Sequence, residues 1–320
     1  MRRPIVAEDL WLSDALRALG LDAQRVPIGP GDDAAWLRTG GDVVVTTDVI
    51  VDGVHFDSSV HDIEHIAWKA VAVNVSDLAA MGAEPLACVV GGVLSRPVER
   101  ATFDALMAGL RKAATALGCP LIGGDTNTAD GPLTLAVTAL GRPMGDAPIT
   151  RAGAQAGNRL SVTGALGGSL LERHLHVRPR LDAARALVAT GAVCAMMDLS
   201  DGLARDLPRL ARASGLAARL EAQAVPIHAD VHRMASQGHP ACREHSLAHA
   251  LEDGEDFELL VAHRSLTAQD RATLGAAGVV LHPIGVLETG PAGRVLLVHG
   301  EGRAARVETL GPGGYDHLSP

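Results

Sequence analysis

The sequence predicts an α/β protein made of two lobes, and three observations carry this prediction. With 320 residues, of which 47% are hydrophobic, the chain is long enough to bury two cores. From about residue 43 onward, apolar β-branched runs alternate with Ala/Leu-rich segments of helical period, as in domains that layer helices on a sheet. Turn-forming residues at 141–148 interrupt the alternation, so we place the lobes at 1–145 and 146–320.

The individual elements follow from the spacing of apolar residues, which recur at the helical period in helices and at alternate positions in strands. Gly82 and Gly118 are expected to end two helices, because glycine readily adopts the left-handed conformation found at helix C-termini. In the N-terminal lobe the predicted helices span 62–81 and 98–117, and the predicted strands span 43–51, 86–94, 120–122 and 133–140. In the C-terminal lobe, strands are expected at 159–163, 193–197 and 257–261, and a helix at 200–213.

Charge and cysteine content limit the classes of partner. The 37 acidic against 28 basic residues give a net charge of -9, which argues against binding to nucleic acid or to an anionic membrane surface. No apolar run reaches transmembrane length, and the acids that soon follow the opening Met-Arg-Arg-Pro predict no signal peptide. Four widely spaced cysteines fit neither a zinc site nor a disulfide scaffold, so we expect a reducing, cytoplasmic location.

Two common nucleotide-binding signatures are absent. The two lysines, Lys69 and Lys112, both lie outside any GxxxxGK[ST] pattern, which excludes a P-loop. The sequence also contains no His-Arg-Asp motif of a protein-kinase catalytic loop. Residues 29–34 match GxGxxA loosely, but the adjacent carboxylates of Asp32 and Asp33 would repel a pyrophosphate.

A series of aspartates points instead to a cation site. Asp48 and Asp125 follow apolar runs, and we expect them at the carboxyl ends of strands, where α/β proteins place ligands. Asn74 and Asp77 are three residues apart and therefore share one face of the predicted helix. The segment 198–202 lies where a strand gives way to a helix, so its side chains and first amides can serve a cation and an anion together.

Each aspartate alone is more simply a helix cap or a turn residue. Taken together they indicate a ligand, because clustered carboxylates are costly to bury unless divalent cations neutralise them. Magnesium prefers carboxylate, water and phosphate oxygens, and the sequence has no organised Cys/His set for a softer metal. The histidine pairs 174/176, 228/232 and 245/249 are interpreted as surface residues.

Ten short blocks, taken in order, resemble the signatures of the thiamine-monophosphate kinase family, and they extend over residues 31 to 317. The helical run 73–83 and the block DLSDGL at 198–203 are the most specific. The other blocks are GDDAA at 31–35, TTD at 46–48, GVHF at 53–56, GGDT at 123–126, TRAG at 150–153, VTG at 162–164, GEDFEL at 254–259 and GYDH at 314–317.

The resemblance implies the fold of aminoimidazole-ribonucleotide synthetase. In that fold a mixed-sheet N-terminal lobe binds ATP and magnesium and pairs with its copy in a homodimer, and the C-terminal α/β lobe completes the active site. The resemblance assigns ATP contacts to Gly124, Asp125, Arg151 and Ser200, and the thiamine-phosphate pocket to His55, Glu255 and Tyr315. It assigns several magnesium ions to Asp33, Thr46, Thr47, Asp48, Asp77, Asp125, Asp198 and Asp201.

Two positions depart from the family pattern. Asp253 stands where a second glycine is usual before Glu255, and Asn127 stands where another threonine is common. Both residues flank acids carried over from the family, so they bear on substrate geometry more than on magnesium binding.

The implied reaction is magnesium-dependent transfer of the ATP γ-phosphoryl group to thiamine monophosphate, giving thiamine diphosphate and ADP in thiamine diphosphate biosynthesis. The acceptor phosphate, whose second pKa is about 6, is largely deprotonated at neutral pH and needs no strong base. We therefore expect direct transfer without a covalent nucleophile, with Arg151 stabilising charge on the transferred group.

Two alternatives stay open. Another ATP-using member of the superfamily is one, but a selenophosphate synthetase should carry a reactive Cys and a Lys near its start, whereas the first ones here are Cys88 and Lys69. A hydrogenase-maturation relative is expected to end in cysteine, unlike the Leu-Ser-Pro found here. The second alternative is a non-catalytic magnesium-nucleotide sensor, which the substrate-side residues His55, Glu255 and Tyr315 make less favourable.

Overall fold

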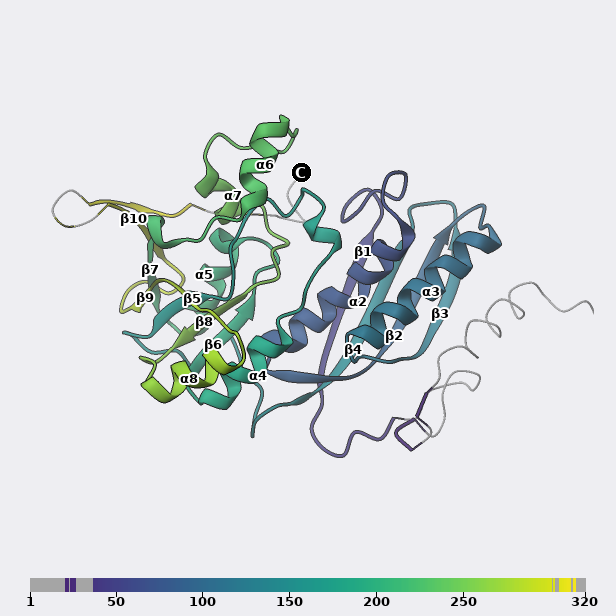
Figure 1. Ribbon diagram of the computed structural model, residues 1–320, viewed down its shortest axis with the longest axis horizontal. Coiled ribbons are helices and arrows are strands. Elements are labelled where there is room, and N and C mark those ends of the chain that lie inside the picture. The colour runs from purple at the N-terminus through teal and green to yellow at the C-terminus, as the bar shows by residue number, and fades with distance from the viewer. Residues whose placement is uncertain are drawn as a thin grey trace, which may run out of the picture. The chain divides into compact units, whose positions relative to one another are not determined.

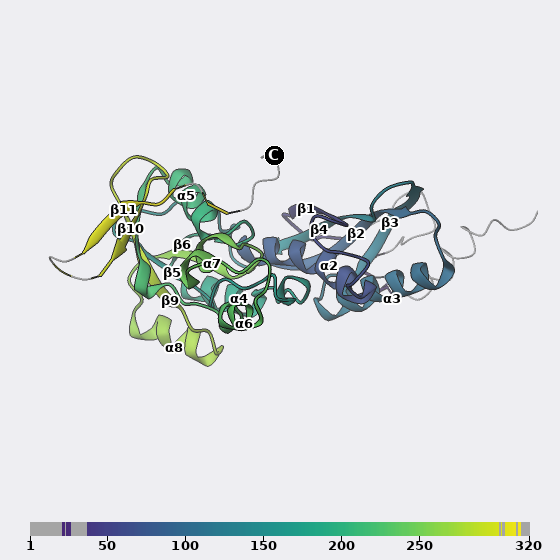
Figure 2. The ribbon, with the colours of Figure 1, turned by 90° about the horizontal axis from the view of Figure 1, so that it is seen from above.

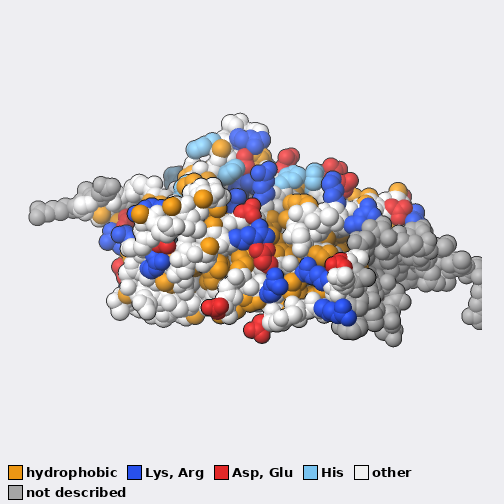
Figure 3. Space-filling model, turned by 60° about the horizontal axis from the view of Figure 1, so that its bottom comes forward, with side chains coloured by type: hydrophobic (Ala, Val, Ile, Leu, Met, Phe, Trp, Pro, Cys, Tyr) orange, Lys and Arg blue, Asp and Glu red, His pale blue; other side chains and the backbone are white. Residues whose placement is uncertain are grey.

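A computed structural model describes residues 21–22, 24–26, 37–300, 302, 305–311 and 313–314. The chain divides into two compact units, Met1–Leu78 with Glu84–Pro143, and Ala79–Ala83 with Met144–Pro320 (Figure 1). Among the described residues, no helix is long and apolar enough to cross a membrane. Figure 3 shows acidic and basic side chains interspersed on one face of the molecule.

The first unit is a mixed four-stranded sheet with the order β1-β4-β2-β3. Strands β1 and β4 pair antiparallel, whereas β2 and β3 pair parallel. The elements in chain order are β1 Val44–Val51, α2 Ile63–Ala80, β2 Ala83–Ser95, α3 Arg100–Ala116, β3 Leu121–Ala129 and β4 Thr134–Pro143. This confirms the mixed-sheet architecture that the resemblance implies.

Helices α2 and α3 lie on one face of this sheet (Figures 1 and 2). The two helices approach closely at Gly109, where a Cβ atom would lie 2.8 Å from the Cβ of Ala67. On the opposite face Val45, Val49 and Val93 are 61%, 49% and 37% exposed, whereas Ala87 and Ile122 pack with Val26 in a small core cluster. Alternate residues of a strand point to opposite faces, so this sheet has one buried and one partly open side.

The second unit contains a seven-stranded sheet with the order β11-β10-β7-β9-β5-β8-β6. Its strands are β5 Arg159–Val162, β6 Val193–Asp198, β7 Ala217–Glu221, β8 Leu259–His263, β9 His282–Glu288, β10 Val295–His299 and β11 Arg306–Thr309. Its helices are η1 Arg173–Leu175, α4 Leu181–Thr190, α5 Leu203–Ala213, η2 Ala222–Ala224, α6 Ala229–Gln237, α7 Ser246–Glu252 and α8 Ala268–Ala276.

Both faces of this second sheet are covered, and strand alternation divides the core into two clusters. Leu260 of β8 packs with Leu207 of α5 in one cluster. Leu259, the residue before it, packs with Leu187 of α4 and Leu274 of α8 in the other cluster. Figure 2 shows the same layering, with α5 on one side of the sheet and α4 and α8 on the other.

The structure confirms each strand and helix predicted from periodicity, but it corrects three details. Asp48 and Asp125 lie inside β1 and β3 instead of at their carboxyl ends, because both strands continue along their paired neighbours. The predicted linker begins too early, since β4 continues to Pro143. Of the histidines interpreted as surface residues, His174 and His249 are only 7% and 1% exposed and form hydrogen bonds inside the second unit.

Candidate active site

Strand β1 and helix α2 bring two carboxylates together in the first unit. Thr46 and Asp48 are two residues apart on β1, so they point to the same face of the sheet, toward α2. The Thr46 hydroxyl donates to Asp77 Oδ2, and the Asp48 amide donates to Asn74 Oδ1 at 3.1 Å. The expectation that Asn74 and Asp77 share one face of the helix is therefore confirmed.

Electrostatics make Asp48 and Asp77 a tightly linked pair. Burial, followed by the charge of Asp77 and a hydrogen bond with it, raises the pKa of Asp48 to about 7. Two adjacent carboxylates resist carrying full charge together, and a bound cation removes this penalty. The oxygens of Thr46, Asn74 and the two acids are hard ligands, so the set fits magnesium. Within the described ranges, no three His, Cys, Asp or Glu side chains gather closely enough to hold a metal by themselves.

Other predicted residues of this unit lie on the open face of the sheet. Thr47 points away from α2, and its hydroxyl donates to the carbonyl of Val137 at 3.1 Å. Asp125 is exposed and pairs across the strands with Gly91, so it shares the face of Thr47 and not that of Asp48. The structure thus separates the predicted magnesium ligands of the first unit into two groups.

Gly124 and Asn127 both lie on β3, and each has a local structural explanation. A Cβ atom at Gly124 would lie 2.1 Å from the carbonyl oxygen of Val90, so only glycine permits this strand pairing. The side chain of Asn127 accepts a hydrogen bond from the amide of Thr128 at 2.8 Å. Asn127, which stands where the family commonly has threonine, is therefore held by a bond to the backbone of its own strand.

His55 lies in the loop between β1 and α2, and buried contacts hold that loop. Its Nδ1 accepts a hydrogen bond from the amide of Val51 at 3.1 Å, which leaves the proton of the neutral ring on Nε2. Lys69, whose side chain is fully buried, donates from Nζ to the carbonyl of His55 at 2.7 Å. Lys69 is a supporting residue that the sequence analysis missed, and its place within an apolar helical run was the available signal.

In the second unit the segment 198–202 joins β6 to α5, as predicted. Asp198 ends β6 and is only 3% exposed. The carboxylate of Asp201 accepts a hydrogen bond from Arg209 Nη1 at 2.6 Å, and Arg205 Nε lies 3.8 Å away. Two arginines therefore already balance the charge of Asp201, which the sequence analysis did not anticipate.

A tight turn places Glu255 directly beside Ser200. The amide of Glu255 donates to the carbonyl of Ser200 at 2.7 Å, and the amide of Phe257 donates to the carbonyl of Leu199 at 2.9 Å. Gly254 adopts φ +70°, and a Cβ atom there would lie 2.7 Å from the Ser200 oxygen. The residue assigned to the thiamine-phosphate pocket thus adjoins one assigned to ATP.

Arg151 follows Thr150, which pairs with β6 at the edge of the seven-stranded sheet. Met196 of β6 donates from its amide to the carbonyl of Thr150 at 3.0 Å, and the Ser214 hydroxyl donates to the carbonyl of Arg151 at 3.2 Å. The side chain of Arg151 is exposed. Backbone contacts thus fix its main chain, while the guanidinium group remains accessible.

A cavity of about 450 Å³ opens in the second unit beside Glu255. Its lining contains four arginines, two histidines and four acids: Arg173, Arg178, Arg180, Arg233, His176, His228, Glu172, Asp230, Glu255 and Asp256. The sequence analysis missed all of these except Glu255. The arginine-rich segment 173–180 was the available signal, but composition alone did not distinguish it from an ordinary solvated surface.

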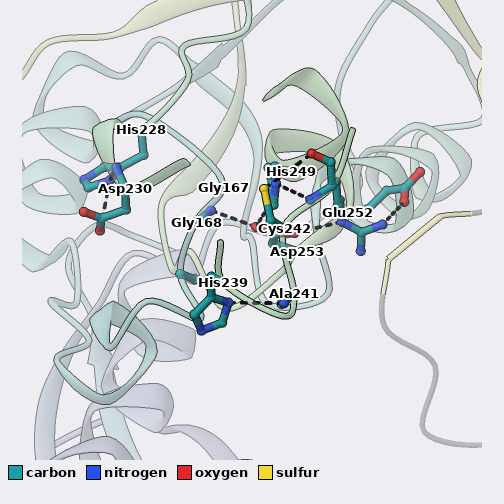
Figure 4. A network of polar contacts seen from close by, with 12 residues as sticks. Gly167, Gly168, His228, Asp230, His239, Ala241, Cys242, His249, Glu252 and Asp253 are labelled. Atoms are coloured by element: carbon teal, nitrogen blue, oxygen red, sulfur yellow. Dashed lines mark hydrogen bonds and ion pairs between the residues drawn. The ribbon is translucent and has the colours of Figure 1, made fainter. Parts of the chain in front are cut away.

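The departure at Asp253 has a structural explanation (Figure 4). Its buried carboxylate accepts hydrogen bonds from the Gly168 amide at 2.8 Å and from Arg243 Nε at 3.0 Å. His249 Nδ1 lies 2.8 Å from the same carboxylate, and His249 Nε2 accepts from the Arg243 amide at 2.8 Å. Asp253 therefore ties the segment between α6 and α7 to the turn that carries Glu255. The remaining predicted residues, Asp33 and Tyr315, lie outside the described residues.

Comparisons with known proteins show the family of the chain. Residues 31–142 match the family model of the AIR synthase related protein N-terminal domain, and residues 151–298 match that of the C-terminal domain. A thiamine-monophosphate kinase of Rhodopirellula baltica is 41% identical over 256 residues, which cover 77% of this chain and 78% of that protein.

Solved structures give the same result. The structure of a thiamine-monophosphate kinase from Stenotrophomonas maltophilia K279a has a TM-score of 0.76 at 31% identity and covers 90% of this chain and 95% of its own. That of AaThiL complexed with AMPPCP and TMP has a TM-score of 0.70 at 25% identity and covers 93% and 95%. The chain therefore belongs to the thiamine-monophosphate kinase family of AIR synthase related proteins.

Proposed function

We propose that the protein transfers the γ-phosphoryl group of ATP directly to thiamine monophosphate, producing thiamine diphosphate and ADP with the help of magnesium. Family membership and a relative that binds AMPPCP and TMP together support the reaction and its two substrates. The observation that carries the magnesium assignment is the linked pair of Asp48 and Asp77, whose carboxylates need a cation to be fully charged together.

The chain's own residues supply positioning and charge balance. Asp48 and Asp77, with the oxygens of Thr46 and Asn74, would hold magnesium at β1 and α2. Bound there, the cation would neutralise phosphate oxygens. The exposed guanidinium of Arg151 would stabilise negative charge on the transferred group. We assign no residue to covalent catalysis, since the acceptor phosphate is already an anionic nucleophile.

The other predicted residues are proposed to contact the two substrates or further magnesium ions. Ser200 and Gly124 contact ATP, and His55, Glu255 and Tyr315 bind thiamine monophosphate. The adjacency of Ser200 and Glu255 supports these assignments, because the two substrates must meet at the transferred phosphoryl group. Further magnesium ligands are Asp33, Thr47, Asp125, Asp198 and Asp201. Of these, Asp201 must share its carboxylate with Arg209.

The open face of the first unit supports a homodimer. Val45, Val49 and Val93 are exposed on a sheet face that also carries Thr47 and Asp125, and exposed apolar side chains on one sheet face suit an interface with a second copy. We therefore assign dimerisation and ATP binding to the N-terminal lobe, 1–145, and completion of the site to the C-terminal lobe, 146–320. Four free cysteines, two of them buried, are compatible with the proposed cytoplasmic location.

Product analysis tests this proposal. Purified protein is mixed with ATP, magnesium and thiamine monophosphate, and controls omit magnesium or the acceptor. Thiamine diphosphate and ADP formed together, in the complete mixture alone, are the expected result. Nucleotide binding without either product would refute the proposed activity and favour the sensor or another superfamily reaction.

A further inference from the structure

The turn that carries Glu255 has an unusual backbone. Glu255 and Phe257 adopt φ +51° and +50°, although neither is glycine. Side chains with a Cβ atom avoid this left-handed region, and such residues persist only where the surroundings hold them in place. The residue between them, Asp256, anchors the turn.

Asp256 is buried, with a side chain that is 1% exposed, and it is bound from two sides. The Gly167 amide lies 3.0 Å and 3.2 Å from its two carboxylate oxygens. Arg173 Nη2 donates to Asp256 Oδ1 at 2.9 Å and to the Gly167 carbonyl at 2.7 Å. Asp256, Arg173 and Gly167 thus form a closed group of hydrogen bonds that fixes the centre of the turn.

Arg173 connects this group to the cavity. The residue belongs to the short helix η1 and lines the cavity together with Glu255 and Asp256. Its Nε atom lies 3.5 Å from Oδ2 of Asp230, another residue of the cavity lining. One side chain therefore links the wall of the cavity to the strained turn from which Glu255 projects.

We propose that Arg173 and Asp256 are positioning residues that hold Glu255 in the orientation needed to bind the acceptor substrate in this cavity. The inference rests on the proposed function, since it assigns thiamine monophosphate to Glu255. A buried ion pair is weak evidence for a stabilising role, because well-packed apolar residues often stabilise equally well. Its place between two left-handed residues points instead to control of geometry.

The orientation of Glu255 should affect one substrate more than the other. Ser200, on the ATP side, is flanked by Leu199, whose amide donates to the Glu258 carbonyl and whose carbonyl accepts from the Phe257 amide, each at 2.9 Å. These backbone bonds do not involve Arg173. Loss of Arg173 should therefore release the Glu255 side chain while the ATP-binding segment keeps its place.

Steady-state kinetics of Arg173→Gln, with each substrate varied in turn, test this proposal. The matched control is Arg264→Gln, which breaks another ion pair of the second unit. Arg264 Nη1 lies 2.6 Å from the largely buried Asp270, and neither residue lines the cavity. Thermal unfolding of both variants shows whether each loses a similar amount of stability.

We expect Arg173→Gln to raise KM for thiamine monophosphate about tenfold or more while KM for ATP stays within about twofold. Arg264→Gln should leave both constants near their wild-type values. Arg173→Lys, which keeps the charge and one donor, should recover part of the loss. Equal changes in both KM values, a loss matched by the control, or unchanged kinetics would each overturn the inference.

Two further measurements keep the test decisive. If Arg173→Gln does not fold, Asp256→Asn and Arg173→Lys take its place, with the same expected split between the two KM values. Calorimetric titration of thiamine monophosphate into wild-type protein tests the proposed function separately from the positioning role of Arg173. Wild-type protein that neither binds nor phosphorylates it would refute the proposed function, whereas an active wild type with an unaltered Arg173 variant would refute the positioning role alone.

Discussion

The amide of Glu255 donates a hydrogen bond to the carbonyl of Ser200 at 2.7 Å. This bond joins a residue proposed to bind the acceptor to one proposed to bind ATP, through the backbone of two segments more than fifty residues apart in sequence. This backbone contact can be perturbed without changing any charged group.

Gly254→Ala should disrupt this contact. The new Cβ would lie 2.7 Å from the Ser200 oxygen, in a backbone conformation of φ +70°, so we expect a loss of about 1–3 kcal/mol in the free energy of unfolding. Turnover should fall as well. The control is Gly275→Ala in α8, which has nothing within 4 Å and should stabilise the helix slightly. Urea denaturation of both variants measures the difference, and equal stabilities would contradict the steric argument.

Asp48→Asn should nearly abolish turnover while leaving the fold intact, because it removes a ligand charge and almost no volume. We expect kcat/KM to fall by at least about 100-fold. Asp104→Asn on α3, which breaks an exposed ion pair with Arg100, serves as the control in the same unit. Activity assayed over a magnesium titration provides the measurement, and an Asp48 variant with wild-type rates would remove this residue from the site.

Glu255→Gln should impair the use of thiamine monophosphate more than that of ATP. The substitution keeps the shape of the side chain and removes its charge, so a contact with the cationic ring of the acceptor is weakened selectively. We expect KM for thiamine monophosphate to rise roughly tenfold. Glu244→Gln, at a side chain that is 89% exposed, controls for the change in net charge. Equal losses for both substrates would argue against the pocket assignment.

His263 should make stability depend on pH. It is buried on β8, where its Nε2 lies 2.9 Å from Ser161 Oγ, and burial is the main cause that lowers its pKa below the ordinary value of 6.5. As the pH falls below 6.5, the unfolded chain takes up a proton that the folded protein does not, so the free energy of unfolding decreases. Above 6.5 the ring is neutral in both states and this effect vanishes.

Denaturation of wild-type protein and His263→Gln between pH 7.5 and pH 5 checks this sign. The wild type should lose more stability toward low pH than the variant, by at most about 1.4 kcal/mol per pH unit for one proton. Parallel profiles for the two proteins would mean that His263 takes up its proton in the folded state as readily as in the unfolded chain.

Val49→Lys tests the open sheet face of the first unit. Val49 is 49% exposed, and a lysine there would be tolerated by an isolated subunit but would bury a charge in a dimer. We expect wild-type protein to sediment as a dimer and the variant as a monomer with a similar circular dichroism spectrum. Dimeric behaviour of both proteins would show that the interface lies elsewhere.

Helical spacing and strand alternation of apolar residues were enough to predict the elements of the first unit, but in the second unit they predicted only β5, β6, β8 and α5. Leu207 lies on the buried face of α5, and Leu260 and Leu259 alternate between the two core clusters, because burial selects apolar side chains at helical and strand spacing. Short motifs added the link between Asp48 and Asp77. The shared face of Asn74 and Asp77 followed from one turn of helix, which is a local property, whereas the place of Asp48 inside β1 did not.

What the sequence by itself determined is therefore the order of the elements in the first unit, part of the second unit and the family. Only the tertiary structure decided that β3 places Asp125 on the face opposite Asp48, that Arg209 binds Asp201, and that Arg173 holds Asp256 beneath Glu255. These relationships depend on strand register and on contacts between segments distant in the chain. Local periodicity carries no information about such contacts, since it is the packing of the whole domain that fixes them.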